Sequence, residues 1–438
     1  MGVREAIERR TGWDRDWDWA LADLLPVAGV VQSFLLSALF LRALFAPGYL
    51  IHNDFITPLS FTPSFFSRFV YAWDPVTGAF SYNTPKLTLQ VASAVLSALG
   101  VHSSLVYKLL VVFVLGLAGA TMFRLLYART VGFAGPGRAY AAATVGSLVF
   151  VVNPWVVNKL HHHFWLVLGC ALLPVVYGLY TAALDGRGGL PVLLALALSF
   201  AVEATQPHSV FIYALPVLGV AAVVHLLGDL SVDRVVAFGR TNLRIGVVSA
   251  LLNMFWMLPL GLFYLRTSPT PGGYVMTVGN LQSLSRESTM LRTLNLRSGI
   301  GMKGLVQGGF AASFETGVGL LDQVWPAVGL VLVAVAVAAL LVPSEHCRRE
   351  RLSFGVLAAV SAVLLTGTEP PFGDLYLRAA LDLPMGWMLR DPFKFGGLFV
   401  FSLAGLTGLG TAHALAALRS VRERGDPLVT ATKAANRG

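Results

Sequence analysis

The chain has 438 residues, of which 55% are apolar and only 13% are charged, with 32 basic and 23 acidic residues. Soluble domains have about 25% charged residues, so this composition excludes a soluble enzyme and a disordered chain. The formal net charge of +9 resembles a nucleic-acid signal until the basic residues are placed. Because most of them flank apolar segments, they indicate membrane topology instead, and we expect no nucleic-acid partner.

The first segment, residues 1–23, mixes basic and acidic residues, whereas a cleavable signal peptide would be basic and short. Trp13, Trp17 and Trp19 fall in this segment, and indole rings favour the membrane interface. We therefore expect an amphipathic N-terminus that lies on the cytoplasmic membrane surface.

Ten segments are predicted to span the membrane, since a span needs about 20 predominantly apolar residues. They cover residues 24–46, 105–128, 139–157, 164–184, 190–205, 208–228, 243–265, 324–343, 352–367 and 394–418. A further stretch, residues 87–100, has the length of an interfacial or re-entrant helix. The sequence therefore predicts an all-α integral membrane protein, with about ten transmembrane helices in one bundle over residues 24–418.

The basic residues predict the orientation of this bundle. With the N-terminus inside, 19 of the 32 fall on the cytoplasmic side, provided that residues 87–100 do not cross the membrane. We predict a multi-pass plasma-membrane protein with both termini cytoplasmic, including a basic tail at 419–438. The long connections 47–104, 266–323 and 368–393 then lie outside and carry the unusual residues, so the active face is expected to be extracytoplasmic.

The first outer loop contains two aspartates in aromatic surroundings. Asp54 comes about eight residues after the first span, and Asp74 belongs to a Trp-Asp-Pro sequence, with Arg68 nearby. A partly desolvated carboxylate near the membrane surface can act as a general base. The alternative is that Asp54 and Asp74 cap turns, as Asn-Asp and Asp-Pro pairs often do.

The third span ends in Asn153-Pro-Trp-Val-Val-Asn-Lys-Leu-His-His-His-Phe, where Pro154 can break the helix. Three consecutive histidines point about 100° apart on a helix, so they cannot all bind one metal ion. A metal site would need a histidine from another segment (His52, His102 or His208). The alternatives are that His162 contacts a polar headgroup, or that the histidines simply lie in a hydrated loop at the membrane surface. The expected function requires no metal ion.

The fifth span ends in Glu203-Ala-Thr-Gln-Pro-His208. An acid this close to an apolar stretch is costly unless it faces a cavity or a partner. Glu203 is therefore expected either to line a substrate cavity or to reach the outer interface.

The last outer loop ends in Arg390-Asp-Pro-Phe-Lys394-Phe at the start of the final span. Arg390 and Lys394 are four residues apart and can share one helical face. An arginine offers a bidentate fork for phosphate, and a lysine offers a mobile point charge. The alternative is that both side chains anchor the helix end among lipid headgroups.

Together these segments resemble the membrane glycosyltransferases of the GT-C fold, in particular the multispanning arabinofuranosyltransferases and mannosyltransferases. The matching features are an acidic first outer loop, the Asn153-Pro154-Trp155 exit and the segment from Arg390 to Phe395. The loop has the form Asp54…Pro58…Trp73-Asp74-Pro75…Gly78.

The resemblance implies transfer of a sugar from a polyprenyl-phosphate carrier to a glycan, lipid or protein acceptor outside the cytoplasm. Asp54 matches the general base of such enzymes, and Arg390 and Lys394 match the residues that hold the carrier phosphate. No cofactor is implied, and residues 87–100 would be an interfacial helix of that fold. Further substrate contacts are expected from Arg68, Asp74, His162, Glu203 and His208. The large outer sugar-binding domains of the long relatives are not seen, which leaves acceptor recognition open.

Two other functions are compatible with the composition. One is a transporter or flippase of a lipid-linked sugar, for which paired repeats and broken mid-membrane helices would be expected. The other is a non-catalytic scaffold of a cell-envelope assembly.

Overall fold

The computed structural model describes residues 13–47, 51–52, 55–56, 73–74, 79–80, 87–266, 276–286, 288–297, 315–383 and 386–425. The side chains of residues 13–23 and 51–89, and those of His161 and His162, are outside this description. Residues 1–12 of the predicted N-terminal segment, most of the first outer loop, much of the 266–323 loop and most of the basic tail lie outside it as well.

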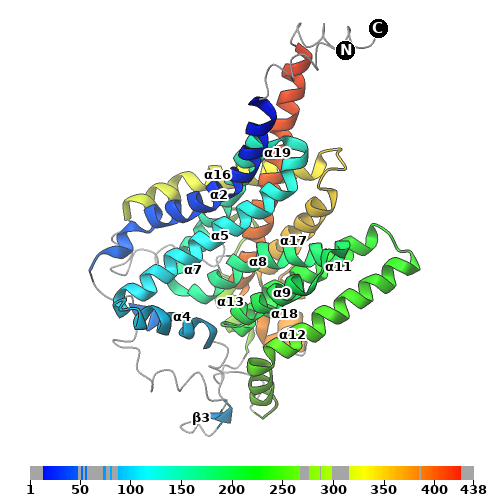
Figure 1. The fold of residues 1–438 in the computed structure, drawn as a ribbon. Helices are drawn as coiled ribbons and strands as arrows, with labels where there is room; N and C mark the ends of the chain where they lie inside the picture. The colour runs from blue at the N-terminus through cyan, green and yellow to red at the C-terminus, as the bar shows by residue number, and fades with distance from the viewer. Residues whose placement is uncertain are drawn as a thin grey trace.

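Long helices account for most of the described chain (Figure 1). In lipid every backbone polar group needs an internal partner, so apolar runs of this length form helices. The long helices are α2 (Trp13–Phe40), α4 (Leu87–Ala98), α5 (Ser103–Ala134), α6 (Pro136–Val151), α7 (Pro154–His162), α8 (Phe164–Ala182), α9 (Leu190–Glu203), α11 (Leu215–Leu227), α12 (Val232–Arg266), α16 (Glu315–Leu341), α17 (Arg348–Thr366) and α19 (Gly396–Gly425).

Shorter elements connect these helices. They are α10 (Pro207–Ser209), α13 (Val278–Ser285), α14 (Met290–Leu294), α18 (Gly373–Asp382), the π-helical turns η3 (Ala183–Arg187) and η4 (Val210–Ala214), and the 3₁₀ turns η1 (Arg42–Phe45), η7 (Gly386–Leu389) and η8 (Pro392–Phe395).

Six helices in the described part of the chain are long and apolar enough to cross a membrane, or seven if α6 and α7 form one bent span. The protein is thus an all-α membrane protein, as its composition predicts. The predicted segments 24–46 and 190–205 correspond to shorter apolar helices, Leu24–Phe40 and Leu190–Glu203. The number of ten spans and the GT-C fold stay predictions.

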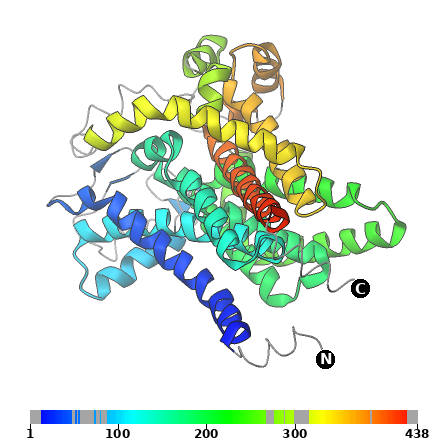
Figure 2. The same cartoon turned by 90° about the horizontal axis from the view of Figure 1, so that it is seen from above.

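The core lies where α5, α6, α8 and α19 meet, and α19 runs through the middle of the bundle (Figure 2). Of the apolar window in each span, 67% is buried in α5 and 72% in the spans containing α8 and α19, against 22–33% in the spans of α11, α12 and α16. Rings from α6, α8, α17 and α19 pack together at the centre. Phe401 meets both Phe150 and Phe354 face to edge, and Tyr177 is tilted against Phe354 with 5.2 Å between the ring centres. The outer helices therefore present their apolar side chains to lipid.

Two local signals end helices, and the second of them is predicted from the sequence. Gly135 adopts a φ of 82° between α5 and α6, a conformation that L side chains rarely adopt. Asn153 caps α7, because its side chain accepts a hydrogen bond from Val156 N at 3.0 Å, and Pro154 follows as the first helical residue. The third predicted span, 139–157, is consequently not one straight helix: α6 and α7 meet at an angle of 49°.

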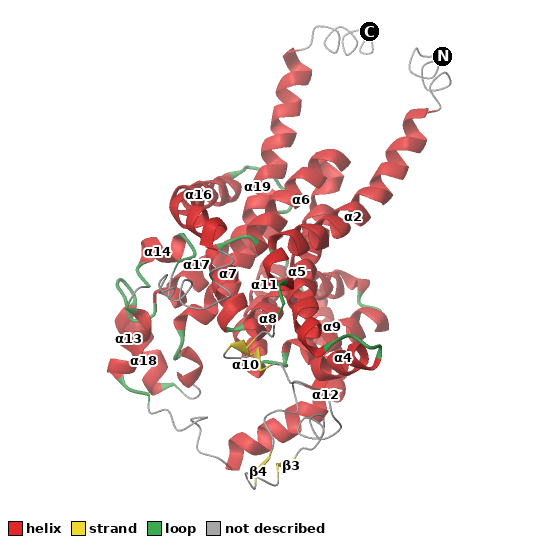
Figure 3. Cartoon of the chain, turned by 90° about the vertical axis from the view of Figure 1, so that its left-hand side faces the viewer, coloured by secondary structure: helices red, strands yellow, loops and turns green. Residues whose placement is uncertain are grey.

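Contacts between connections define two ends of the bundle. At one end, which we call the arginine end, the connections after α5, α8 and α16 meet through Arg129–Glu350 and Asp185–Arg349 ion pairs. At the other, which we call the loop end, α7 and the start of α19 meet, and α4 and β3 lie on this side (Figures 1 and 3). The beginning of α2 and the end of α19 both lie on the side of the arginine end.

The first outer loop contains two antiparallel strand pairs that the sequence does not indicate. β1 (Ile51–His52) pairs with β2 (Phe55–Ile56), and β3 (Trp73–Asp74) pairs with β4 (Ala79–Phe80). The apolar stretch that follows is α4, which with 12 residues is too short to cross a bilayer. An interfacial or re-entrant position for this helix therefore stays in agreement with the structure.

Candidate functional site

One face of α7 meets the segment that starts the last helix. Trp155 and Lys159 are four residues apart in α7, so they lie on the same side of the helix, and His163 follows as the C-terminal cap of α7. All three contact Phe393: Trp155 Nε1 donates to its carbonyl at 2.8 Å, Lys159 Nζ lies 3.7 Å from the ring centre, and His163 stacks on the ring at 5.3 Å. The Asn-Pro-Trp exit and the Arg-Asp-Pro-Phe-Lys-Phe segment, which are 238 residues apart at this hydrogen bond, therefore form one site.

Asp391 holds the two predicted phosphate-binding residues. Its carboxylate lies 2.6 Å from Lys394 Nζ and 2.8 Å from an Arg390 guanidinium nitrogen. Burial would raise the pKa of Asp391, but Lys394 and Arg390 outweigh it and lower the pKa to about 2. The aspartate is therefore ionised at ordinary pH, and part of the positive charge of Arg390 and Lys394 is neutralised within the protein.

The backbone of this segment is fixed by bonds from neighbouring helices. Tyr213 donates its hydroxyl to the Lys394 carbonyl at 2.7 Å. A Cβ on Gly397 would lie 2.7 Å from Tyr213 Cζ, and a Cβ on Gly396 would overlap the indole of Trp155. Two glycines therefore allow the start of α19 to approach the two aromatic side chains that hold it.

Lys159 has no ion-pair partner among the described residues, and the charge of Asp391 acts on it from beyond ion-pair distance. It is only 4% exposed. The face of Phe393 compensates part of the cost of burying the charge, since a cation is attracted to an aromatic ring. We call Lys159, Arg390, Asp391 and Lys394 the cationic cluster: three cations share one carboxylate.

His208 lies beside the cationic cluster. Its ring packs edge-on against Trp387 with 5.1 Å between ring centres, and Gln206 Nε2 lies 3.3 Å from its Nδ1. Burial lowers the pKa of His208 to about 4, assisted by the positive charges of Lys394 and Arg390 and opposed by Asp391. His208 is therefore neutral at physiological pH and adds hydrogen-bonding capacity to the site without adding charge.

Glu203 ends α9 and lies apart from these cations. It is 1% exposed, and neither of its carboxylate oxygens has a hydrogen-bond partner among the described residues. It lies within electrostatic reach of Cys170 and Tyr213, and Tyr213 in turn binds the Lys394 carbonyl. The predicted substrate contact of Glu203 therefore stays a prediction. In the structure Glu203 is connected to the cations through Tyr213.

The structure brings together three of the predicted site residues, His208, Arg390 and Lys394. Asp54 and Arg68 are outside the described residues, and only backbone is described for Asp74, in β3, and for His162, at the end of α7. Among the described side chains, no group of three histidines, cysteines or carboxylates is placed to hold a metal ion. His102 instead caps α5, because its Nδ1 accepts a hydrogen bond from Ser104 N at 3.3 Å.

Sequence reasoning missed four members of this site: Lys159, His163, Trp387 and Asp391. Asp391 was part of the quoted motif, but only its neighbours Arg390 and Lys394 were predicted to belong to the site. Lys159 had a signal that could have identified it, because it is a lysine four residues after Trp155, just beyond the predicted apolar span 139–157. Trp387 had no comparable signal, since its contact with His208 crosses from one connection to another.

No family model, curated protein or solved structure matches the chain. The functional assignment therefore depends on the geometry of the cationic cluster and on the motifs in the sequence.

Proposed function

We propose that the chain is a membrane glycosyltransferase that takes a sugar from a polyprenyl-phosphate carrier and binds the carrier phosphate at the cationic cluster. The observation that carries this proposal is Lys159, a buried lysine without a carboxylate partner among the described residues. A buried charge is costly unless an opposite charge approaches it, so Lys159 is suited to a ligand that brings an anion.

The other cations fit the same ligand. Lys394 has 13% of its side chain exposed and Arg390 has 36%, so Arg390 is the more accessible of the two. A phosphate that meets Arg390 first and then Lys159 and Lys394 would neutralise the charge that Asp391 leaves uncompensated. Charge that develops on the departing phosphate would be stabilised in the same way.

In this proposal Asp54 removes the proton from the acceptor hydroxyl as that oxygen attacks the anomeric carbon of the sugar. The bond between the anomeric carbon and the phosphate oxygen breaks, and the phosphate leaves with the electron pair. Trp155, Tyr213 and Asp391 act as positioning residues, because they hold the backbone or the cations and not the sugar.

The test is sugar transfer in membranes that contain the full chain, with polyprenyl-phosphate-linked arabinose and mannose as radiolabelled donors. Lys159→Gln is expected to lower the transfer rate by roughly 100-fold, as loss of one charge-stabilising donor does in other enzymes. Arg378→Gln is the matched control, since this exposed arginine of α18 lies outside the cluster, and it is expected to retain the wild-type rate.

Asp54→Asn is expected to abolish transfer while the protein keeps its thermal unfolding midpoint. Wild-type rates in both Asp54→Asn and Lys159→Gln would overturn the proposal. Loss of transfer in Arg378→Gln to the same extent as in Lys159→Gln would show that the total charge of the loop end matters and not the cluster.

A carrier for a lipid-linked sugar is the second candidate, and one observation favours it. α6 and α7 are broken at 49°, and α9 ends in a buried carboxylate without a hydrogen-bond partner among the described residues. Broken helices and intramembrane ionisable groups are typical of transporter sites. Movement of a fluorescent lipid-linked sugar across proteoliposomes, without transfer to any acceptor, would identify this function.

A further inference from the structure

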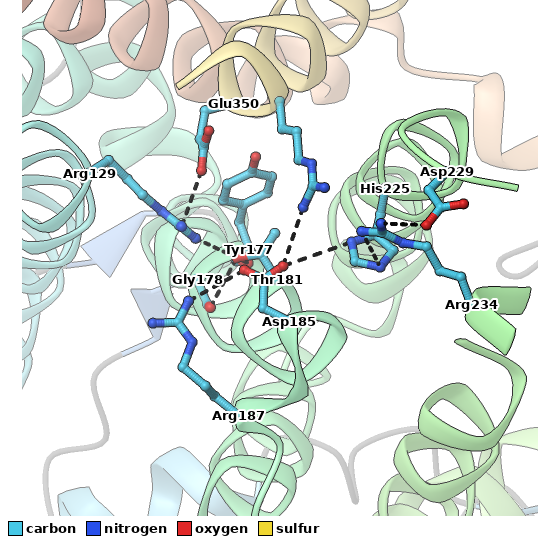
Figure 4. A network of polar contacts seen from close by, with 11 residues as sticks. Arg129, Tyr177, Gly178, Thr181, Asp185, Arg187, His225, Asp229, Arg234 and Glu350 are labelled. Atoms are coloured by element: carbon cyan, nitrogen blue, oxygen red, sulfur yellow. Dashed lines mark hydrogen bonds and ion pairs between the residues drawn. The ribbon is translucent and has the colours of Figure 1, made fainter. Parts of the chain in front are cut away.

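Ion pairs join α5 and the turn η3 to the start of α17 at the arginine end (Figure 4). Arg129 of α5 reaches Glu350 of α17 at 3.1 Å and donates to Thr181 Oγ1 of α8 at 2.7 Å. This arginine is thereby committed to structure, with one carboxylate and one hydroxyl as fixed partners.

Asp185 is shared in a second group at the same end (Figure 4). It lies 3.4 Å from nitrogens of both Arg187 and Arg349, and 4.0 Å from His225 Nδ1. One carboxylate thus serves two arginines, and 67% of the Arg187 side chain stays exposed. Positive charge is in excess here.

A groove of about 710 Å³ opens beside these charges, between α2, α5 and α8. Its charged lining consists of Arg124, Arg129 and Arg187. Its other walls are mainly apolar and include Phe34, Leu117, Leu125, Pro174 and Leu179. The volume is in the range of small-molecule sites, and the combination of an apolar wall with basic residues is that of an amphipathic anion site.

Arg124 is the member of the groove without a compensating charge. It is exposed, and no carboxylate among the described residues lies within ion-pair distance of it. α5 continues for ten residues to Ala134, or roughly 15 Å, so Arg124 lies well inside the helix. Arg124 also falls near the end of the predicted span 105–128, where a charge is costly in lipid unless it reaches the headgroups or meets an anion.

The occupant is expected to be a lipid and not a soluble anion. α2, which forms one wall with Val30 and Phe34, exposes Val27, Val31 and Leu35 beside them, at 57%, 51% and 65%. Exposed apolar side chains of this kind face acyl chains. A ligand of this groove therefore needs both an anionic head for the arginines and hydrocarbon for the walls.

We propose that this groove, which we call the arginine groove, binds an anionic glycerophospholipid of the surrounding leaflet. Its phosphodiester lies against Arg124 and Arg187, and its acyl chains run along the apolar walls of α2, α5 and α8. The site is at the opposite end of the bundle from the cationic cluster, so it stands independently of the proposed glycosyltransferase activity.

The test is native mass spectrometry of the full chain in detergent, titrated with phosphatidylglycerol or with phosphatidylcholine of the same acyl chains. The wild-type protein is expected to retain phosphatidylglycerol in preference to phosphatidylcholine. Arg124→Gln combined with Arg187→Gln is expected to weaken phosphatidylglycerol binding roughly tenfold and to leave phosphatidylcholine binding unchanged.

Two further variants separate a groove from general attraction of anionic lipid. Arg244→Gln is the matched control, because Arg244 is an exposed arginine at similar depth in the apolar helix α12 and does not line the groove. It is expected to bind phosphatidylglycerol as the wild type does. Ala128→Trp fills the groove beside Arg124 without changing charge, and it is expected to weaken phosphatidylglycerol binding as the arginine variants do.

Three results would overturn the proposal. One is equal retention of the two phospholipids by the wild type, and another is an equal loss in Arg244→Gln and in the Arg124 and Arg187 variant. The third is binding of polyprenyl phosphate in the groove with no retention of phosphatidylglycerol.

Discussion

At the scale of single residues, the candidate site combines groups that burial and charge keep in different protonation states. Asp391 stays ionised, because Lys394 and Arg390 overcome the cost of its burial and lower its pKa to about 2. His208 stays neutral, because burial and the same two cations lower its pKa to about 4. The site therefore keeps one negative and one neutral partner beside its cations over the whole physiological pH range.

The pKa of His208 makes stability depend on pH in a defined window. An unfolded histidine binds a proton near pH 6.5, whereas folded His208 binds it only near pH 4. The unfolded state thus gains protons as pH falls, and the free energy of unfolding is expected to decrease between these values by up to about 3 kcal/mol. The thermal unfolding midpoint in detergent, measured from pH 7 to pH 4, checks this.

His208→Gln is expected to flatten that part of the pH profile, since glutamine keeps hydrogen-bonding atoms but does not titrate. His346→Gln, at an exposed histidine of the arginine end, is the control for replacing a histidine elsewhere in the chain. Parallel profiles for the wild type and His208→Gln would contradict the prediction.

At the scale of elements, the start of α19 is the segment on which the site depends. Its carbonyls accept from Trp155 of α7 and Tyr213 of η4, and glycines 396 and 397 let these aromatic side chains approach. These carbonyls and Lys394 itself belong to the 3₁₀ turn η8, which leads directly into α19. Displacement of this segment would therefore move Lys394 and break the hydrogen bonds from Trp155 and Tyr213 at the same time.

Gly397→Ala is expected to destabilise the protein by roughly 1–3 kcal/mol, because the added Cβ would lie 2.7 Å from Tyr213 Cζ and the packed ring has to move. Gly219→Ala in α11 is the matched control: nothing lies within 4 Å of the added Cβ, and alanine favours the helix. Thermal unfolding in detergent measures both. A Gly397→Ala protein as stable as Gly219→Ala would show that the Tyr213 contact adapts without cost.

At the scale of the whole molecule, the two ends of the bundle differ in what holds them. The arginine end is joined by ion pairs through Arg129, Asp185 and Glu350. The loop end is joined by aromatic and backbone contacts around Phe393. The contacts at the arginine end join the short basic connections that the charge distribution predicts to be cytoplasmic, and those at the loop end join connections predicted to lie outside.

Cysteine labelling tests the predicted orientation of this bundle. In a chain with Cys170 and Cys347 replaced by alanine, Glu345→Cys marks the arginine end and Leu383→Cys marks the loop end; both positions are exposed. A membrane-impermeant maleimide added to intact cells is expected to label residue 383 and to reach residue 345 only after the membrane is permeabilised. Labelling of residue 345 in intact cells would reverse the orientation.

The sequence by itself determined the membrane class, the helical segments and the two ends at which the connections meet. Apolar runs and basic flanks are local properties, and lipid forces such runs into helices. The break at Asn153-Pro154 was equally readable, because capping and the missing proline N–H act within one turn.

Only the tertiary structure decided which charges are compensated. Arg390 and Lys394 were predicted to contact phosphate, and the fold in addition directs both at Asp391 and leaves Lys159 facing the Phe393 ring. It also set Arg124 and Arg187, from separate helices, on one groove. The physical reason is that compensation of a charge depends on distances between segments far apart in the chain, and no local pattern specifies those distances.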